Sequence, residues 1–207
     1  KKEVFMQQYP SIDKQIIKGQ DYYIFDKLDG SNIRVEFSVK KGFDKFGTRK
    51  KLMSDDSGIL NQSKDLILKN EDIILNIFKK NKWQAGTLFF EFYGPNSFAG
   101  FHEELDDFKV SLIDAHINNK GYLEPKEYLK AFEDRIEISP LLHVGKLNSS
   151  TVEQIQNGTF EGMTFEGIIG KAFLKNKHIR CKVKNKQWID KLKNRYGEDS
   201  EMFNVLL

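Results

Sequence analysis

Lys27 stands in a segment whose residue types suit covalent chemistry, the run Asp26-Lys27-Leu28-Asp29-Gly30. A lysine amine attacks phosphorus only in its neutral form, so a nucleophilic lysine needs a pKa lowered by burial or by neighbouring cations. The flanking residues favour strands, because residues 22–25 are aromatic and branched and residues 33–39 alternate apolar with polar. Lys27 is therefore predicted to lie where a strand ends in a turn, with Gly30 supplying backbone freedom.

The same local sequence has a simpler interpretation. An Asp-Gly pair between two strand-like runs is an ordinary signal for a β-hairpin turn, which needs no chemistry. On the local residues alone, the hairpin is favoured over the nucleophile. More distant segments must therefore decide whether Lys27 has a reactive pocket.

Charged residues recur within otherwise apolar runs elsewhere in the chain. They are Glu91, Glu166, Lys182 and Lys184. Burying a charge is costly unless it is paired or binds a ligand, so each of these residues needs a partner. Alternation along a strand places the two lysines on one face, where they suit a polyphosphate, while the carboxylates suit a metal ion or ribose hydroxyls. One shared pocket is the simplest arrangement, although each residue alone is also compatible with a structural ion pair or an exposed strand face.

The order of these segments resembles the covalent nucleotidyltransferase superfamily, which comprises ATP-dependent RNA and DNA ligases and mRNA capping enzymes. The resemblance covers about residues 9–195 and implies that Lys27 forms a lysyl-N-nucleotide. At the fifth position after Lys27, DNA ligases and capping enzymes typically carry arginine, whereas Asn32 is similar to the T4 RNA ligase 2-like branch. An RNA ligase is therefore expected, with Arg34 able to restore some of the arginine function at the nucleotide.

The resemblance also implies roles for the distant motif residues. Arg49, in Phe-Gly-Thr-Arg, would touch the nucleotide and position the RNA end, and Glu91 would engage the ribose. Glu166 would help to hold the catalytic metal. Lys182 and Lys184 would contact the α-phosphate.

Adenine recognition is the remaining part of the expected nucleotide site. Asp26 occupies the position of an adenine-contacting acid in the family. The adenine-stacking residue is expected to be Phe108, with Val110 as the alternative, because the strand that follows resembles a family segment ending in an acid such as Asp114.

The reaction implied by the resemblance uses ATP, Mg²⁺ or Mn²⁺, and RNA with 5′-phosphate and 3′-OH ends. Lys27 would attack the α-phosphate of ATP, AMP would pass to the RNA 5′-phosphate, and the 3′-OH would then seal the ends. The metal and the two lysines are expected to favour the neutral form of Lys27. Two alternatives stay open: a DNA ligase or mRNA capping guanylyltransferase, and a non-catalytic module that binds nucleic-acid ends.

The elements that must position these residues are predicted from periodicity and turn signals. Strands outnumber helices and helices come between them, which favours an α+β fold, and the resemblance implies an antiparallel-sheet-rich nucleotidyltransferase domain with flanking helices. Residues 1–207 are expected to form a single domain, with no C-terminal OB-fold or helical domain visible after Arg195. The predicted strands cover residues 87–94, 108–117, 164–171 and 178–183, and the predicted helices cover 61–82 with a break near Asn70, 123–136 with Pro125 near its start, and a segment from 186 onward.

Composition bounds the class of protein. A chain of 207 residues with 39% hydrophobic content can bury a sizeable core, and no apolar run approaches the roughly 20 residues that span a membrane. No secretory signal opens the sequence, so an intracellular, cytoplasmic monomer with no membrane partner is expected. One cysteine excludes an internal disulfide. Residues 171–195 are strongly basic with Asp190 as their one acid, which indicates either a phosphate-rich partner or a solvated basic face.

Overall fold

The computed structural model describes residues 6–12, 14–54, 57–95 and 107–207. Within these residues the strands form two sheets, every pairing is antiparallel, and the chain divides into two compact units. The expected α+β class with antiparallel sheets and flanking helices is confirmed. Of the described residues, unit 1 comprises 6–11, 30–54, 57–95 and 107–139, and unit 2 comprises 12, 14–29 and 140–207.

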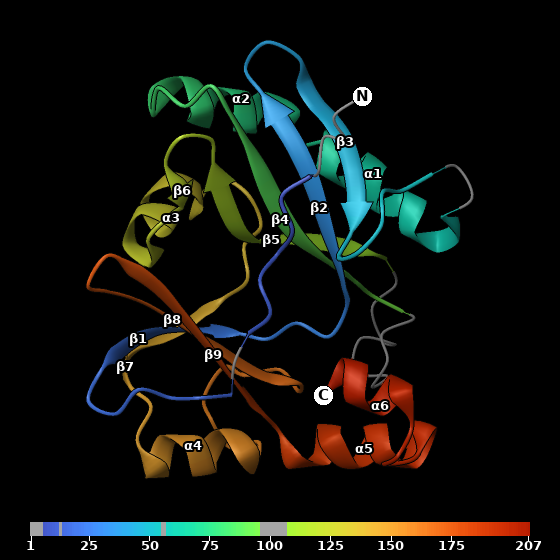
Figure 1. Ribbon diagram of the computed structural model, residues 1–207, viewed down its shortest axis with the longest axis vertical. Helices are drawn as coiled ribbons and strands as arrows, with labels where there is room; N and C mark the ends of the chain where they lie inside the picture. The colour runs from blue at the N-terminus through green and yellow to red at the C-terminus, as the bar shows by residue number, and fades with distance from the viewer. Residues whose placement is uncertain (1–5, 13, 55–56, 96–106) are drawn as a thin grey trace. The chain divides into compact units, whose positions relative to one another are not determined.

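Unit 1 is built on a five-stranded sheet with the order β3-β2-β4-β5-β6 (Figure 1). The central strand β4 is mostly buried and β2 is buried in its middle, which explains their aromatic and branched composition. The strands of this sheet are β2 (Ser31–Ser38), β3 (Gly42–Thr48), β4 (Ala85–Tyr93), β5 (Lys109–Ile117) and β6 (Gly121–Tyr122).

Helices pack on the sheet of unit 1 through one apolar face each. Phe78 is fully buried, and its ring meets that of Phe37 on β2 with centroids 4.8 Å apart. The predicted break near Asn70 is confirmed, because one helix ends at Leu68 and the next begins at Glu71. These helices are α1 (Gln62–Leu68), α2 (Glu71–Lys80) and α3 (Pro125–Phe132), the last starting at a proline as expected. The short helix η1 (Gly58–Asn61) precedes α1 and has no buried residue.

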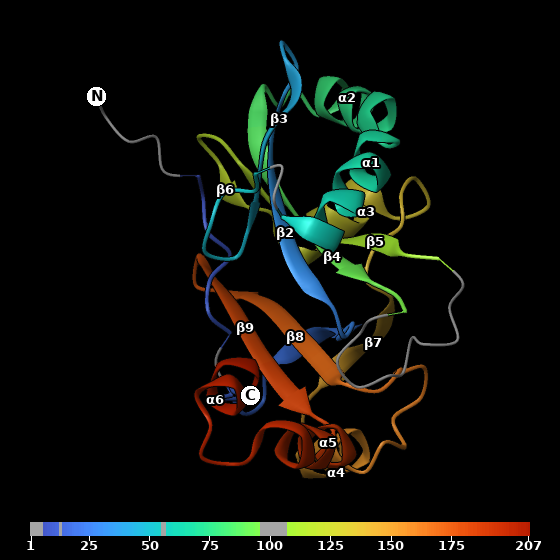
Figure 2. The same ribbon diagram turned by 90° about the vertical axis from the view of Figure 1, so that its right-hand side faces the viewer.

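Unit 2 contains a four-stranded sheet with the order β7-β1-β8-β9. In Figure 2, β8 and β9 run side by side as a long hairpin, which agrees with their continuous register from Gly167↔Lys184 to Leu174↔Lys177. The bounds are β1 (Asp21–Asp26), β7 (Leu141–Lys146), β8 (Gly167–Leu174), β9 (Lys177–Lys184), α4 (Ser149–Gln156), α5 (Lys186–Tyr196) and α6 (Glu201–Leu206).

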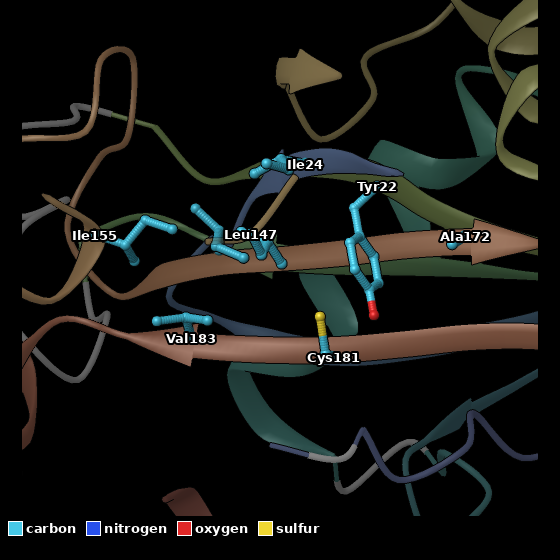
Figure 3. Close-up of a cluster of buried hydrophobic side chains, with 8 residues drawn as sticks. Tyr22, Ile24, Leu147, Ile155, Ala172, Cys181 and Val183 are labelled. Carbon is cyan, nitrogen blue, oxygen red and sulfur yellow. The ribbon is translucent and has the colours of Figure 1, made fainter. Parts of the chain in front are cut away.

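The core of unit 2 lies between its sheet and α4. Tyr22 and Ile24 of β1, Ile155 of α4 and Cys181 of β9 are fully buried in one cluster (Figure 3). Burial raises the pKa of the Cys181 thiol to about 11. A second cluster, formed by Trp188, Leu192 and Phe203, joins α5 to α6.

The hairpin interpretation of the Lys27 segment is wrong. β1 pairs with β7 and β8, whereas β2 pairs with β3 and β4, so the two strands belong to different sheets. An Asp-Gly pair indicates that the chain turns, but it does not indicate which strands will pair with each other. Each strand is central in its own sheet and needs partners on both edges.

Other boundaries also differ from the predictions. Residues 164–166 precede β8, so Glu166 lies just before a strand. Residues 46–48, expected in a turn, end β3, and the strand β7 and the helices α4 and α6 were not anticipated. In the described part of the chain, no helix combines the length and apolar character needed to cross a membrane.

The helix α2 offers a test of the packing in unit 1. Ile77 is 1% exposed and Ile73 is 39% exposed on the same helix, so one chemical change can be compared on two faces. We expect Ile77→Ala to lower the free energy of unfolding by about 2–5 kcal/mol, because it leaves a cavity. Ile73→Ala should change it by about 1 kcal/mol or less. Urea denaturation followed by circular dichroism measures both, and equal losses would contradict the packing described.

Candidate active site

Lys27 follows the last residue of β1 and is fixed through its backbone. Its amide N–H donates to the Gly167 carbonyl at 2.9 Å, and the preceding amide, that of Asp26, donates to Pro140 at 2.9 Å. The Lys27 side chain is 22% exposed, and its Nζ lies 2.8 Å from Oε1 of Glu166. The predicted position at the end of a strand is correct. Glu166, which the resemblance assigns to the metal, is the ion-pair partner of Lys27.

Lys184, at the end of β9, is the second ammonium group on Glu166. Its Nζ donates to the same Oε1 at 2.9 Å and to the Leu206 carbonyl at 2.6 Å. It also lies 3.7 Å from the centre of the Trp188 ring, a cation–π contact. We refer to Lys27, Glu166 and Lys184 as the Glu166 cluster.

Electrostatics in the Glu166 cluster are dominated by burial. Burial lowers the pKa of Lys184 to about 8, and the charges of Lys27 and Lys182 act in the same direction, while Glu166 opposes them. Lys182 lies two residues before Lys184 on β9 and is half-buried. The expectation that these two lysines share a face is consistent with the strand geometry.

The backbone around Glu166 explains how a carboxylate comes to lie between two lysines. Its carbonyl accepts from the Asn185 amide at 3.0 Å, just after β9 ends. Gly167 has φ +140°, and a Cβ there would collide with the backbone carbonyl of Val183. Only glycine allows the start of β8 to approach β9 so closely, and this approach brings Glu166 to Lys184.

Asp26 is 2% exposed, and both oxygens of its carboxylate accept hydrogen bonds from Thr164. Its Oδ1 accepts from the Thr164 amide at 3.0 Å, and its Oδ2 accepts from the Thr164 hydroxyl at 2.8 Å. Burial raises the pKa of Asp26 and the hydrogen bonds from Thr164 oppose that rise. The expected adenine-contacting acid is thus directed at Thr164.

In unit 1, two of the predicted residues face each other across neighbouring strands. Asn32 of β2 is in register with Glu91 of β4. The Asn32 Oδ1 is buried without a hydrogen-bond partner among the described residues, and Glu91 is half-buried. A buried acceptor of this kind is rare in folded proteins and suits a ligand donor.

The other predicted residues of unit 1 have structural contacts. Arg34 is 4% exposed and donates to the carbonyls of residues 6 and 7 at 2.8 and 3.3 Å, and burial lowers its pKa. Arg49 is exposed and donates to the Ser11 hydroxyl at 3.2 Å. The Phe108 ring stacks on that of Phe92 with centroids 5.0 Å apart, and Val110 is in register with Phe92.

Three contacts in or next to the Glu166 cluster were not predicted from the sequence. Trp188 and Leu206 contact Lys184, and Thr164 contacts Asp26, the residue before Lys27. Thr164 could have been suspected of lying near the site, since it lies two residues before Glu166. Nothing in the sequence pointed to Trp188 or Leu206, because contacts between a strand and a helix have no fixed spacing.

Solved structures of an RNA ligase from Naegleria gruberi have the same fold. A lysine-to-alanine variant with ATP and manganese gives a TM-score of 0.68 and 19% identity over 91% of this chain. The ligase with pyrophosphate gives a TM-score of 0.65 and 21% identity over 93% of this chain. An apo aspartate-to-alanine variant gives a TM-score of 0.69 and 20% identity over 93% of this chain. The chain spans 58–59% of the length of those chains. No protein-family model and no curated protein matches the sequence.

The electrostatics of Lys184 yield a pH prediction. Because its pKa in the folded protein is about 8 and the ordinary value is 10.5, the unfolded chain binds more protons between these values. Raising the pH through this window should therefore add stability through Lys184. NMR titration of the lysine side chains should show one group titrating near pH 8 that Lys184→Met removes. If every lysine titrates near its ordinary value, the burial of Lys184 is contradicted.

Proposed function

We propose that this chain is a nucleotidyltransferase domain of an ATP-dependent RNA ligase, to which both units belong, and that Lys27 is its nucleophile. The observation that carries the proposal is the Glu166 cluster. It joins one partly exposed lysine to a buried carboxylate and a buried lysine within a fold shared with an RNA ligase. A solvated structural ion pair would need neither the burial nor the second lysine.

The proposed first step forms a bond from Lys27 Nζ to the α-phosphorus of ATP and breaks the bond from that phosphorus to the pyrophosphate oxygen. Nζ loses one proton to water to become neutral before the attack, and it loses a second proton to water as the phosphoramidate forms. The Glu166 carboxylate, 2.8 Å away, attracts the ammonium form of Lys27. The reactive neutral amine therefore requires that other cations share the charge of Glu166, and Lys184 already does so at 2.9 Å. Lys182 and Lys184 would stabilise the charge that develops on the phosphate.

Two transfers complete the proposed reaction. The AMP on Lys27 passes to the 5′-phosphate of RNA, which regenerates the free lysine. A 3′-OH then attacks the activated phosphate, forms the phosphodiester and releases AMP. In these steps the protein would act by aligning the attacking oxygen with the phosphate and by stabilising the negative charge. No further covalent intermediate with the protein is needed.

Residues of unit 1 are proposed to bind the nucleotide. The buried acceptor of Asn32 and the neighbouring Glu91 suit ribose hydroxyls, which donate hydrogen bonds. Arg49, exposed and cationic, suits a phosphate, and Phe108 suits the base. The contacts of Arg34 with the carbonyls of residues 6 and 7 support an indirect role, in which it holds the segment beside β2.

Glu166 is the proposed protein ligand for Mg²⁺ or Mn²⁺. Among the described residues, no group of three or more histidine, cysteine or acidic side chains could form a metal cage. Mg²⁺ is commonly held by one or two carboxylates together with substrate phosphates and water, so a single buried glutamate fits that chemistry. When bound, the metal would neutralise negative charge on the phosphates.

The nucleophile can be tested by intact-mass measurement after incubation with ATP and Mg²⁺. We expect an AMP-sized increase that Lys27→Ala abolishes, because Lys27 pairs with the buried Glu166 and remains partly exposed. Lys18→Ala is the matched control, since Lys18 is exposed in the same unit, and it should keep the increase. An AMP adduct that survives in Lys27→Ala would rule out Lys27.

Substrate choice is tested with nicked duplexes. We expect the protein to seal a nick flanked by RNA at least tenfold faster than the same nick in DNA, with ATP as the required nucleotide. Gel analysis of labelled strands gives both rates. A covalent GMP adduct from GTP would indicate a capping enzyme, a preference for DNA would indicate a DNA ligase, and RNA retention with no adduct would indicate a binding module.

A further inference from the structure

The contact between Asp26 and Thr164 has a geometry that the proposed chemistry does not by itself require. One residue satisfies both carboxylate oxygens, its amide at 3.0 Å and its hydroxyl at 2.8 Å. Asp26 is 2% exposed, so water contributes little to its solvation. The two hydrogen bonds from Thr164 therefore help to orient the carboxylate.

The two residues stand next to the two reacting groups. Asp26 immediately precedes Lys27, and Thr164 lies two residues before Glu166. They belong to segments 138 positions apart in the chain, and the contact ties the end of β1 to the segment that leads into β8. The bond from Lys27 N–H to the Gly167 carbonyl, 2.9 Å long, runs between the same two segments.

The side-chain bonds and the backbone bond constrain different features. The backbone bond fixes how far β1 extends along β8. The bonds from Thr164 fix the loop before β8, which has left the strand register and carries the backbone of Glu166. Loss of the hydroxyl would leave Oδ2 of Asp26 buried without that donor, and a buried carboxylate is expected to turn or to take up a proton.

We propose that Thr164 is a positioning residue that holds Lys27 and Glu166 in reacting geometry by locking the Asp26 carboxylate. This inference rests on the proposed nucleotidyl transfer. Burial raises the pKa of Asp26, and the bonds from Thr164 counteract this rise, so the same contact helps to keep the carboxylate charged. Thr164 touches neither reacting group through its side chain and acts through Asp26.

The test compares Thr164→Val with Thr164→Ser in the full chain. Valine keeps the shape and the backbone donor but removes the hydroxyl, whereas serine restores the hydroxyl. The rate of AMP attachment to Lys27 is measured over a range of ATP concentrations by intact mass and is divided by the folded fraction from circular dichroism. Thr159→Val is the matched control, because the Thr159 hydroxyl donates to the Gln154 carbonyl at 3.3 Å in an exposed part of the same unit.

We expect Thr164→Val to lower the maximal rate about tenfold or more and to change the half-saturating ATP concentration less than about threefold, since misplacement affects the reacting geometry more than binding. Thr164→Ser and Thr159→Val should stay within about threefold of the unchanged protein. Adding Asp26→Asn to Thr164→Val should cause little further loss, because the two residues act as one unit.

The outcomes separate the two proposals. If the unchanged protein forms no AMP adduct, the proposed function fails and the positioning role fails with it. If the unchanged protein forms the adduct and Thr164→Val does so at the same maximal rate per folded molecule, only the positioning role is overturned. Equal losses in the valine and serine variants would also overturn it, since the hydroxyl would then be irrelevant.

Discussion

The buried carboxylate of Glu166 is the constraint on which the rest of unit 2 depends. A charge in this position destabilises the fold by several kcal/mol unless cations accompany it, and here two lysines from different strands share one of its oxygens. That requirement fixes where β1 ends, how closely β8 approaches β9, and why glycine occupies position 167. Lys27 directly follows β1 and Lys184 ends β9, and the hydrophobic cluster of unit 2 contains buried residues of both strands.

The charges around Lys184 include both signs. Lys27 and Lys182 repel its ammonium group, Glu166 attracts it, and burial also works against its charge. A phosphate bound beside these lysines would relieve the repulsion between them.

Much of the fold was predictable, since long apolar runs such as 87–93 and the two-part helix 62–80 carry strong periodicity. Sheet membership was not, because β1 and β2 look like a hairpin while their partners lie far along the chain. In the site, Glu166 and Lys184 were found because a charge in an apolar run demands a partner. Trp188 and Leu206 could not be found, since their contacts with Lys184 depend on how α5 and α6 fold back.

The single cysteine of the chain lies sealed within the core of unit 2, and its thiol holds its proton at neutral pH. Thiol reagents act on the exposed, deprotonated form, so this sulfur is shielded from them in the folded state. Cysteine-specific reagents should therefore label the folded protein very little. One new cysteine on the surface of either unit would therefore accept a fluorophore or spin label at a known position in the sequence.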